Sequence, residues 1–342
     1  MNLVLIFGLL LAVFLSAQWI TGRFCRSGAA QKILDIPNAR SSHAVATPRG
    51  GGMAIVLTTL PALVILGSVG ATTSALVSGL LGGGALVALI GFADDHAHIA
   101  PRWRLLGHFI AALWVVTWLR GLPSLPMLGF AVELGWIGYV LAVIYLVWVL
   151  NLTNFMDGID AIAGVEVITV SVGGAILYLV TVPSGTQWLA PLVLASATLG
   201  FLMWNWPPAK IFMGDGGSGF LGLMLAALSL QAAWVEPKLF WSWIILLGVF
   251  VVDATVTLVL RVTRGEKFYE AHRSHAYQHA AEKTGAHLPV VLAVGAINLG
   301  WLLPCATLVA LGSLDGIAGV VIAYAPLVAA ALWLRAGRPV VK

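Results

Sequence analysis

Four polar side chains recur at intervals of three between positions 151 and 160. They are Asn151, Asn154, Asp157 and Asp160. Positions three apart share a face of a helix, so a helix here would present two amides and two carboxylates in one stripe. Amide and carboxylate oxygens suit Mg²⁺, and amides also donate to sugar or base edges. The alternative is a capping and turn cluster, although a cap needs one such residue rather than four in register.

An adjacent acidic pair, Asp94 and Asp95, follows an apolar stretch. Two carboxylates close to hydrocarbon repel each other and lose hydration unless a cation or a hydrogen-bond donor compensates them. The pair is therefore a candidate metal site or proton acceptor. The alternative is a solvated acidic loop that faces Arg102 and Arg104.

A glycine-rich segment over 210–219 carries one acid, Asp215, just before an apolar stretch. Glycines let backbone N–H groups approach an anion, and a helix N-terminus favours phosphate. The spacing G-x-G-x-x-G over 214–219 matches a dinucleotide-binding fingerprint, but no strand precedes it and no βαβ unit surrounds it. The segment is either a phosphate-approaching turn or a flexible interhelical turn with close helix packing.

A basic segment over 261–289 is rich in phosphate-binding side chains. Cytoplasmic loops of membrane proteins are generally enriched in Lys and Arg, but this does not account for three histidines within eight residues. Spacings of three and four leave a transition-metal site open, although nothing pairs with these histidines as in a recognised zinc pattern. The residues are Arg261, Arg264, Lys267, His272, Arg273, His275 and His279.

A further polar loop over 35–52 lacks the Gly-Lys-[Ser/Thr] ending of a P-loop. His43 and Arg49 could reach a phosphate from it. They could equally contact lipid headgroups.

The amino-acid composition indicates which kind of secondary structure carries these residues. Of 342 residues, 60% are hydrophobic and 9% charged, and the mean hydropathy is +0.97. Soluble domains are nearer 45–50% apolar and 25% charged, so a soluble globular enzyme and a polar nucleic-acid binder are excluded. The pattern predicts an all-α polytopic membrane protein. We expect about eleven transmembrane helices, over 2–20, 52–70, 75–92, 105–120, 127–150, 162–182, 188–204, 218–234, 240–260, 290–311 and 316–334.

The distribution of charge predicts the orientation. Sixteen of the 18 Lys and Arg residues fall in one set of connections and the tail, and only Arg120 and Lys238 fall in the other set. The positive-inside rule then places the N-terminus outside and the C-terminus in the cytoplasm. Most acids and all histidines share the basic side. We expect one catalytic domain over 1–342, with cytoplasmic active-site loops at 21–51, 93–104, 151–162, 205–217 and 261–289.

In order, these segments resemble the polyprenyl-phosphate N-acetylhexosamine-1-phosphate transferases, the WecA-type and MraY-type enzymes of glycosyltransferase family 4. The resemblance covers residues from about 35 to 285, and its most specific parts are the N-x-x-N-x-x-D-G-x-D run and the M-G-D-x-G-S turn. The P-N-x-R-S-S-H and H-R-S-H-A-Y-Q-H segments resemble the WbpL-like branch, which starts O-antigen and related surface polysaccharides. The long signature of the enzymes that use MurNAc-peptide is absent, which argues against the peptidoglycan step.

The resemblance implies transfer of a sugar 1-phosphate from a UDP-N-acetylhexosamine to undecaprenyl phosphate, with release of UMP. It implies Mg²⁺ held by Asp215 and Asn154, with Mn²⁺ as an alternative. It gives catalytic roles to Asp94, Asp95, Asp157 and Asp160, the first two engaging or deprotonating the lipid phosphate. It gives substrate-binding roles to Asn151, Asn154, His43, Arg49, His272, Arg273, His275 and His279.

Relatives tend to have further histidines where this chain has Tyr277 and Gln278, which leaves the role of His279 open. The implied setting is the bacterial cytoplasmic membrane, as a multi-pass protein without a nucleic-acid partner, and a homodimer is left open. Two alternative functions remain open beside this transferase hypothesis. One is synthesis of the peptidoglycan lipid precursor, and the other is a lipid or solute transporter, for which Glu166 and Asp253 are the acids inside expected spans.

Overall fold

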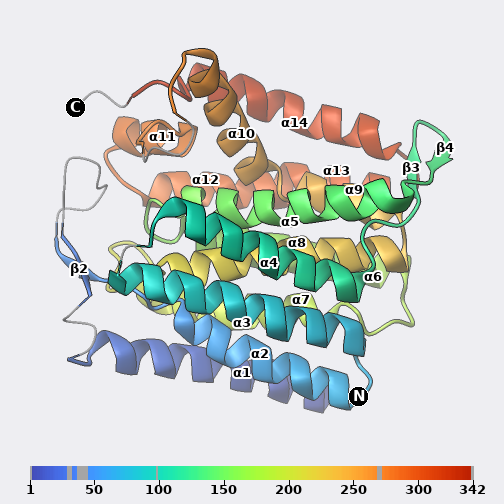
Figure 1. Cartoon of the computed structure of the whole chain (residues 1–342), viewed down its shortest axis with the longest axis horizontal. Helices are drawn as coiled ribbons and strands as arrows, with labels where there is room; N and C mark the ends of the chain where they lie inside the picture. Colours follow the sequence, from blue (N-terminus) through green and yellow to red (C-terminus); the bar gives the residue numbers. More distant parts are fainter. Residues whose placement is uncertain (1, 29–32, 37–44, 98, 268–271, 340–342) are drawn as a thin grey trace.

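The computed structural model describes residues 2–28, 33–36, 45–97, 99–267 and 272–339. These residues form α-helices that lie side by side, most of them along one common direction (Figure 1). Two short antiparallel pairs, β1 with β2 and β3 with β4, join them. The elements are α1 (Leu3–Cys25), β1 (Leu34–Asp35), β2 (Thr47–Pro48), α2 (Met53–Ser68), α3 (Ser74–Ala97), α4 (Pro101–Leu119), β3 (Leu125–Met127), β4 (Phe130–Val132), α5 (Gly135–Met156), α6 (Ile162–Thr181), α7 (Leu189–Asn205), α8 (Asp215–Val235), α9 (Lys238–Leu246), α10 (Gly248–Thr263), α11 (Ala276–Thr284), α12 (Leu288–Ile297), the π-helix η2 (Asn298–Leu302), α13 (Leu303–Ala310) and α14 (Gly316–Trp333).

Among the described residues, seven helices are long and apolar enough to cross a membrane. They are α1, α3, α5, α6, α8, the run from α12 to α13, and α14. The bent pair of α9 and α10 would add an eighth, and α2 and α7 are shorter apolar helices. An all-α protein with several membrane-compatible helices is therefore confirmed. The count of eleven, the orientation and the single catalytic domain stay predictions.

The region expected to span the membrane over 240–260 is not one straight helix, because α9 and α10 meet at an angle of 70°. The Tyr324 hydroxyl donates to the Ile244 carbonyl at 2.5 Å. In a straight helix that carbonyl would accept from the N–H of Gly248. A Cβ at Gly248 would lie 2.9 Å from the Tyr324 ring, so the glycine lets α14 approach the break closely.

Helix α8 is the centre of the assembly, since every one of its residues from Gly216 to Ala233 is buried. A helix buried on every side must let its neighbours approach, and small residues do this. A Cβ at Gly222 would lie 2.7 Å from the Cα of Leu150 on α5. A Cβ at Gly91 of α3 would lie 2.4 Å from the carbonyl carbon of Asp215. Helices α3 and α5 therefore hold the first turns of α8 through backbone contact.

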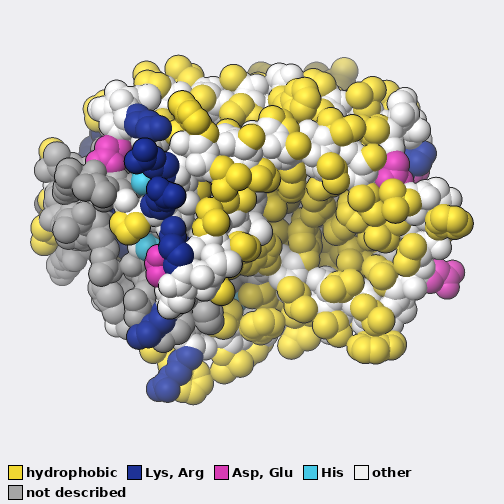
Figure 2. Space-filling view, turned by 90° about the horizontal axis from the view of Figure 1, so that it is seen from above, with side chains coloured by type: hydrophobic (Ala, Val, Ile, Leu, Met, Phe, Trp, Pro, Cys, Tyr) yellow, Lys and Arg dark blue, Asp and Glu magenta, His cyan; other side chains and the backbone are white. Residues whose placement is uncertain are grey.

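The two ends of the helix assembly differ in charge. The pair β1–β2 and helix α11 lie at one end, which we call the α11 end, and β3–β4 lies at the other (Figure 1). On the face seen in Figure 2, Lys and Arg side chains gather near the α11 end, and hydrophobic side chains cover the stretch between the ends. This arrangement matches the charge asymmetry read from the sequence.

The close contact at Gly91 yields a prediction. Gly91→Ala would push a methyl group into the backbone of Asp215 and Gly216, so α3 or the start of α8 must shift. A displacement of about 1 Å can lower catalysis by roughly 100-fold. We expect a loss of that size in turnover while the purified protein remains folded.

Gly79→Ala is the matched control, because Gly79 lies in the same helix and its Cβ would have only ordinary contacts, the nearest at 3.5 Å. We expect it to retain activity. Equal activities of the two variants would contradict the importance of this contact.

Candidate active site

The site is built around Asp215, the first residue of α8. Gly214 precedes it with φ +80°, a conformation that favours glycine. The backbone N–H groups of Asp215 and Gly216 donate to the Asp95 carboxylate at 3.0 and 3.5 Å. Asp95 therefore caps the N-terminus of α8, where a negative charge is favoured by the helix dipole.

Two arginines join three carboxylates. Arg49 binds Asp95 through Nε at 3.0 Å, and its Nη2 contacts one oxygen of Asp215. Arg104 binds the other oxygen of Asp215 through Nη1 at 2.9 Å, and the same nitrogen contacts Asp94. Burial works to lower the pKa of Arg49, but the neighbouring carboxylates, Asp215 first, raise it overall. Arg49 is therefore held as a fixed positive charge between Asp95 and Asp215.

The adjacent acids of α3 have different partners. The Asp95 side chain is 1% exposed and holds α8 and Arg49. Asp94 accepts the backbone N–H of Ile99 at 2.6 Å and contacts Arg104. The alternative of a solvated acidic loop is thus wrong for this pair, since each carboxylate is largely covered and has cationic and backbone partners.

Asn154 connects α5 to α8. Its Nδ2 donates to Ser218 Oγ at 2.8 Å and to Asp215 Oδ1 at 3.2 Å. Asn151, one turn earlier, donates to the carbonyl of Val147 at 2.7 Å. Both amides line a cavity of about 10 Å³, together with Arg104, His108 and Asp215.

Only two residues of the expected four-residue polar stripe, Asn151 and Asn154, lie on one helix. Helix α5 ends at Met156, so Asp157 and Asp160 do not continue the face of Asn151 and Asn154. The Asp160 carboxylate instead accepts the backbone N–H of Ala209 at 3.0 Å. The spacing of three was compatible with a helix, but the chain leaves the helix at Asp157-Gly158, where turn-forming residues follow.

Among the described residues, Asp157 is the acid of this cluster without a cation partner. In the described ranges, no ion pair or hydrogen bond reaches its carboxylate. Burial raises the pKa of Asp157 well above its usual value, and Arg49 offsets this only in part. The neighbouring charges of Asp215 and Asp95 raise it further. Asp157 is therefore the carboxylate most able to take up a proton.

The basic segment contains a helix, α11, which Asp253 of α10 positions. The Asp253 carboxylate accepts the backbone N–H groups of Ala276 and Tyr277, each at 2.9 Å, and lies 3.3 Å from His275 Nδ1. The Tyr277 hydroxyl donates to the carbonyl of Phe155 at 3.2 Å. These contacts bring the basic segment to the end of α5.

The three histidines of this segment do not converge on one point. His275 is buried against Asp253, and His279 Nε2 lies 2.9 Å from the carbonyl oxygen of Arg338. Burial, with the charges of His275 and Arg261, lowers the pKa of His272 to about 3, so it is neutral. The described residues contain no group of three His, Cys, Asp or Glu side chains arranged for a metal. The transition-metal alternative is therefore wrong for these residues.

A larger cavity of about 560 Å³ lies where α11, α12 and the segment before α8 meet. Asp160, Arg273 and His287 supply its polar wall, and Pro207 and Pro208 form another part. Arg273 Nε is buried and has no hydrogen-bond partner among the described residues. Such an atom is costly unless a ligand or water pairs with it. His272, His275 and His279 are not among the residues that line this cavity, and His43 lies outside the described residues.

Four residues were missed as site candidates from the sequence: Arg104, His108, Ser218 and His287. A signal for two of them existed, because Arg104 and His108 lie four positions apart on a helix that begins with Pro101 and so share one face. Ser218 and His287 act through contacts between distant segments, with Asn154 and with the N–H of Asp160.

The residues around the small cavity fit a magnesium ion. Mg²⁺ takes oxygen ligands, commonly one or two carboxylates with water and phosphate oxygens completing its shell. Asp215 offers a carboxylate, and Asn154 uses only its Nδ2, so that no described residue binds its Oδ1. The cavity has room for about one water or ion. Arg104 Nε and His108 Nδ1 are buried there without partners among the described residues, as expected where a ligand completes the site.

Comparison with known proteins matches this chain to enzymes of one family. The profile of glycosyl transferase family 4 matches residues 77–233. A probable undecaprenyl-phosphate N-acetylglucosaminyl 1-phosphate transferase of Bacillus subtilis is 32% identical, over 76% of this chain and 73% of the relative. A decaprenyl-phosphate N-acetylglucosaminephosphotransferase of Mycobacterium leprae is 30% identical, over 75% and 72%. A phospho-N-acetylmuramoyl-pentapeptide-transferase of Synechococcus elongatus is 31% identical, over 73% and 69%.

The raised pKa of Asp157 yields a prediction on stability. A carboxyl group that is easier to protonate when folded costs stability at any pH above its unfolded pKa of about 3.9. Asp157→Asn removes that cost, so we expect its melting temperature near pH 8 to exceed that of the native protein by about 2–4 °C. The gain should shrink as the pH falls, because the raised pKa of Asp157 then matters less to the difference between the folded and unfolded states. Thermal unfolding in detergent measures both effects.

Glu133→Gln is the control, since Glu133 is an exposed acid. It should leave the melting temperature nearly unchanged at every pH. A gain for Asp157→Asn that grows toward pH 5 would show that Asp157 is held ionised by its neighbours.

Proposed function

Because the chain belongs to the polyprenyl-phosphate hexosamine-1-phosphate transferases, we propose that it transfers an N-acetylhexosamine 1-phosphate from a UDP-sugar to undecaprenyl phosphate. The chain is a sugar-phosphate transferase with several membrane-compatible helices. The observation that carries the proposal is the cluster of carboxylates and arginines at the start of α8, together with a cavity of about 560 Å³ that Asp160 and Arg273 line. The cluster and the cavity lie at one end of the membrane helices.

The proposed reaction is a displacement at phosphorus. An oxygen of the lipid phosphate forms a bond to the phosphorus that carries the sugar, and the bond from that phosphorus to UMP breaks. Both reactants are anions, so their repulsion must be cancelled before they can meet. Arg49 and Arg104 already pair with three carboxylates, so the cancelling charge would come from Arg273 in the larger cavity and from a bound cation.

Proton removal is a minor requirement. The second pKa of a phosphate monoester is about 6, so the lipid phosphate is largely dianionic at pH 7. The remaining proton can pass to Asp157, the carboxylate without a cation partner among the described residues. Asp94 and Asp95 then serve chiefly to orient Arg104, Arg49 and α8. We favour a single in-line attack, for which positioning supplies most of the rate.

The larger cavity is the proposed binding site of the UDP-sugar. Its volume lies in the range of small-molecule sites, roughly 300–1,000 Å³. Arg273 offers a buried guanidinium nitrogen to a phosphate, and His287 offers a ring to the nucleotide or sugar. Asp160 fixes this wall through its contact with Ala209.

Magnesium is the proposed metal, with Mn²⁺ as a substitute. Asp215 and Asn154 would hold it, and it would neutralise phosphate charge during the transfer. The relatives act on lipid carriers, which supports a setting in the bacterial cytoplasmic membrane with the α11 end in the cytoplasm.

Within this class we favour initiation of O-antigen or a related surface polysaccharide. The two loop segments quoted for that branch and the missing MurNAc-peptide signature support this choice. The pentapeptide-transferase relatives keep the peptidoglycan step as the second candidate. The transporter alternative has little support, because both acids it requires have structural partners. Glu166 accepts from Asn298 Nδ2 at 2.7 Å, and Asp253 holds α11.

The direct test is release of UMP by purified protein with Mg²⁺, undecaprenyl phosphate and a panel of UDP-N-acetylhexosamines. We expect UMP only when both the lipid phosphate and the metal are present. Asp215→Asn and Asp94→Asn should each lower turnover by about 100-fold or more. Release from UDP-MurNAc-pentapeptide in preference to the simple sugars would favour the peptidoglycan step, and no release from any donor would contradict the proposed reaction.

The cavity also predicts an order of effects within the basic segment. Arg273→Ala removes a wall residue with an unpaired buried nitrogen, so it should raise KM for the UDP-sugar by about tenfold or more. His279→Ala should be milder, because its ring already contacts the Arg338 carbonyl. Steady-state kinetics of the two variants measures this order, and the reverse order would contradict the placement of the sugar nucleotide.

A further inference from the structure

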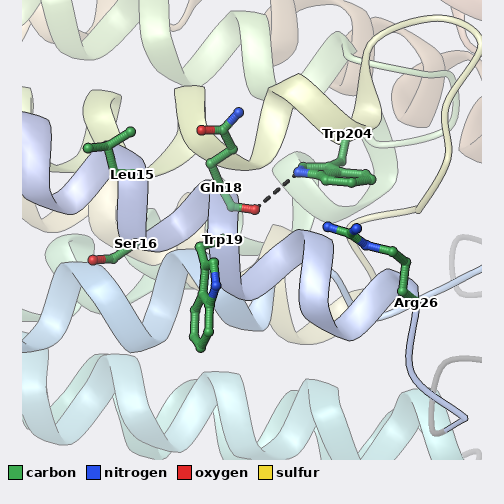
Figure 3. Close-up of a pocket in the computed structure, with 6 residues that line it drawn as sticks. All are labelled: Leu15, Ser16, Gln18, Trp19, Arg26 and Trp204. Atoms are coloured by element: carbon green, nitrogen blue, oxygen red, sulfur yellow. Dashed lines mark hydrogen bonds between the residues drawn. The ribbon is translucent and has the colours of Figure 1, made fainter.

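A groove on the surface of α1 and α7 belongs to neither cavity of the candidate site. Its volume is about 560 Å³. Figure 3 shows Leu15 at one end, Trp204 and Arg26 at the other, and Trp19 between them. A second hollow of about 430 Å³, lined by Arg23, Arg26 and Ser27, adjoins it through Arg26. The groove therefore runs from an apolar stretch of α1 to a cluster of cations.

Trp204 forms a fixed wall of this groove. Its Nε1 donates to the carbonyl of Gln18 at 3.1 Å. A Cβ at Gly22 would lie only 2.4 Å from the Trp204 ring, so the ring packs directly on the backbone of α1. The position of the indole is thus set by two contacts with α1.

Two cations lie on this one ring. The guanidinium carbon of Arg26 is 5.4 Å from the Trp204 ring centroid, and Lys210 Nζ is 5.5 Å from it. Arg23 lies over Trp19 at 6.0 Å. The Arg26 Nε donates to the carbonyl of Gly22 at 3.0 Å, which leaves its two Nη groups for a ligand.

Among the described residues, these cations have no acidic partners. In the part of the chain that the structure describes, no carboxylate forms an ion pair with Arg23, Arg26 or Lys210. Arg49 and Arg104, by contrast, each bind two carboxylates. Like charges gathered around one aromatic ring repel each other, and an anion placed between them removes that repulsion.

The dimensions of the groove match one acyl chain. Leu15 and Arg26 are eleven positions apart on α1, which corresponds to a rise of about 16 Å. That length is roughly half of a hydrocarbon core of about 30 Å. Leu15 is 49% and Trp19 67% exposed, so a hydrocarbon chain can lie on them. Basic pockets between transmembrane helices bind anionic lipid headgroups.

We propose that this groove binds one anionic phospholipid from the leaflet at the α11 end. Its phosphate lies between Arg26 and Lys210, and one acyl chain follows Trp19 and Leu15. A polyprenyl phosphate shares the phosphate chemistry, but its chain is several times longer than the groove. The groove therefore fits the shorter phospholipid better.

The bound phospholipid would contact the segment that precedes Asp215 in the chain. The Lys210 N–H donates to the carbonyl of Trp204 at 2.9 Å. Cys25 Sγ donates to the carbonyl of Lys210 at 3.4 Å. The N–H of Gly52 donates to the carbonyl of Met213 at 2.9 Å. A bound lipid should therefore stabilise this segment as well as α1.

Native mass spectrometry of the full chain in uncharged detergent tests the proposal. The protein is titrated with phosphatidylglycerol, phosphatidylcholine or a polyprenyl phosphate. We expect one phosphatidylglycerol to bind in preference to phosphatidylcholine. The double variant Arg26→Gln/Lys210→Gln should bind it about tenfold more weakly, and phosphatidylglycerol should raise its melting temperature less than that of the native protein.

The matched control is Arg102→Gln/Lys283→Gln. It removes the same charge, and each side chain lies over a tryptophan, Arg102 over Trp103 at 5.5 Å and Lys283 over Trp333 at 4.4 Å, outside the groove. We expect its affinity for phosphatidylglycerol to equal that of the native protein. If the first double variant does not fold, Leu15→Trp keeps the cations and fills the apolar end, and it should weaken the same binding.

Three results would overturn the proposal. One is equal phosphatidylglycerol binding by the native protein and by the groove variant that folds. Another is an equal loss in the control, which would indicate a general charge effect. The third is a groove variant that loses the polyprenyl phosphate but keeps phosphatidylglycerol, which would assign the groove to the other lipid.

Discussion

The partly buried ion pairs at the start of α8 are the interaction on which the rest of the structure depends. Asp94, Asp95 and Asp215 crowd together near hydrocarbon, where uncompensated carboxylates are costly. Arg49 and Arg104 come from separate segments and neutralise them. The loop before α2, the end of α3 and the start of α4 must therefore converge on α8. The same convergence creates a charged site at one end of apolar helices.

The small residues of α3 and α8 make that convergence sterically feasible. Glycines weaken an isolated helix by roughly 0.5–1 kcal/mol each, so their density here needs a structural reason. At Gly91 and Gly222 a methyl group would meet the backbone of a neighbouring helix. Close packing thus replaces helix propensity as the source of stability. It also fixes Asp215 relative to Asn154 and Asp95 more tightly than side chains alone would.

Polar groups at the α11 end form the candidate site. Glu166 Oε2 and the Asp253 carboxylate accept hydrogen bonds within the protein. At the α11 end, buried nitrogens of Arg273 and His108 have no hydrogen-bond partner among the described residues, and no described residue binds the Asp157 carboxylate. A lipid phosphate lies at the headgroup level and a nucleotide sugar is water-soluble, so this end is where both can arrive. The groove at Arg26 adds a lipid contact at the same level.

The sequence by itself determined the membrane class, the family and most acids of the site, because hydropathy and short motifs are local properties. It could not determine where α5 ends, so Asp160 was placed on a stripe that it leaves. It could not show the break at Leu247, which depends on a contact from Tyr324 of α14. Only the tertiary structure joined Arg104 to Asp215 and left Asp157 unpaired among the described residues. Such pairings unite segments far apart in the chain, and no local pattern encodes which cation reaches which acid.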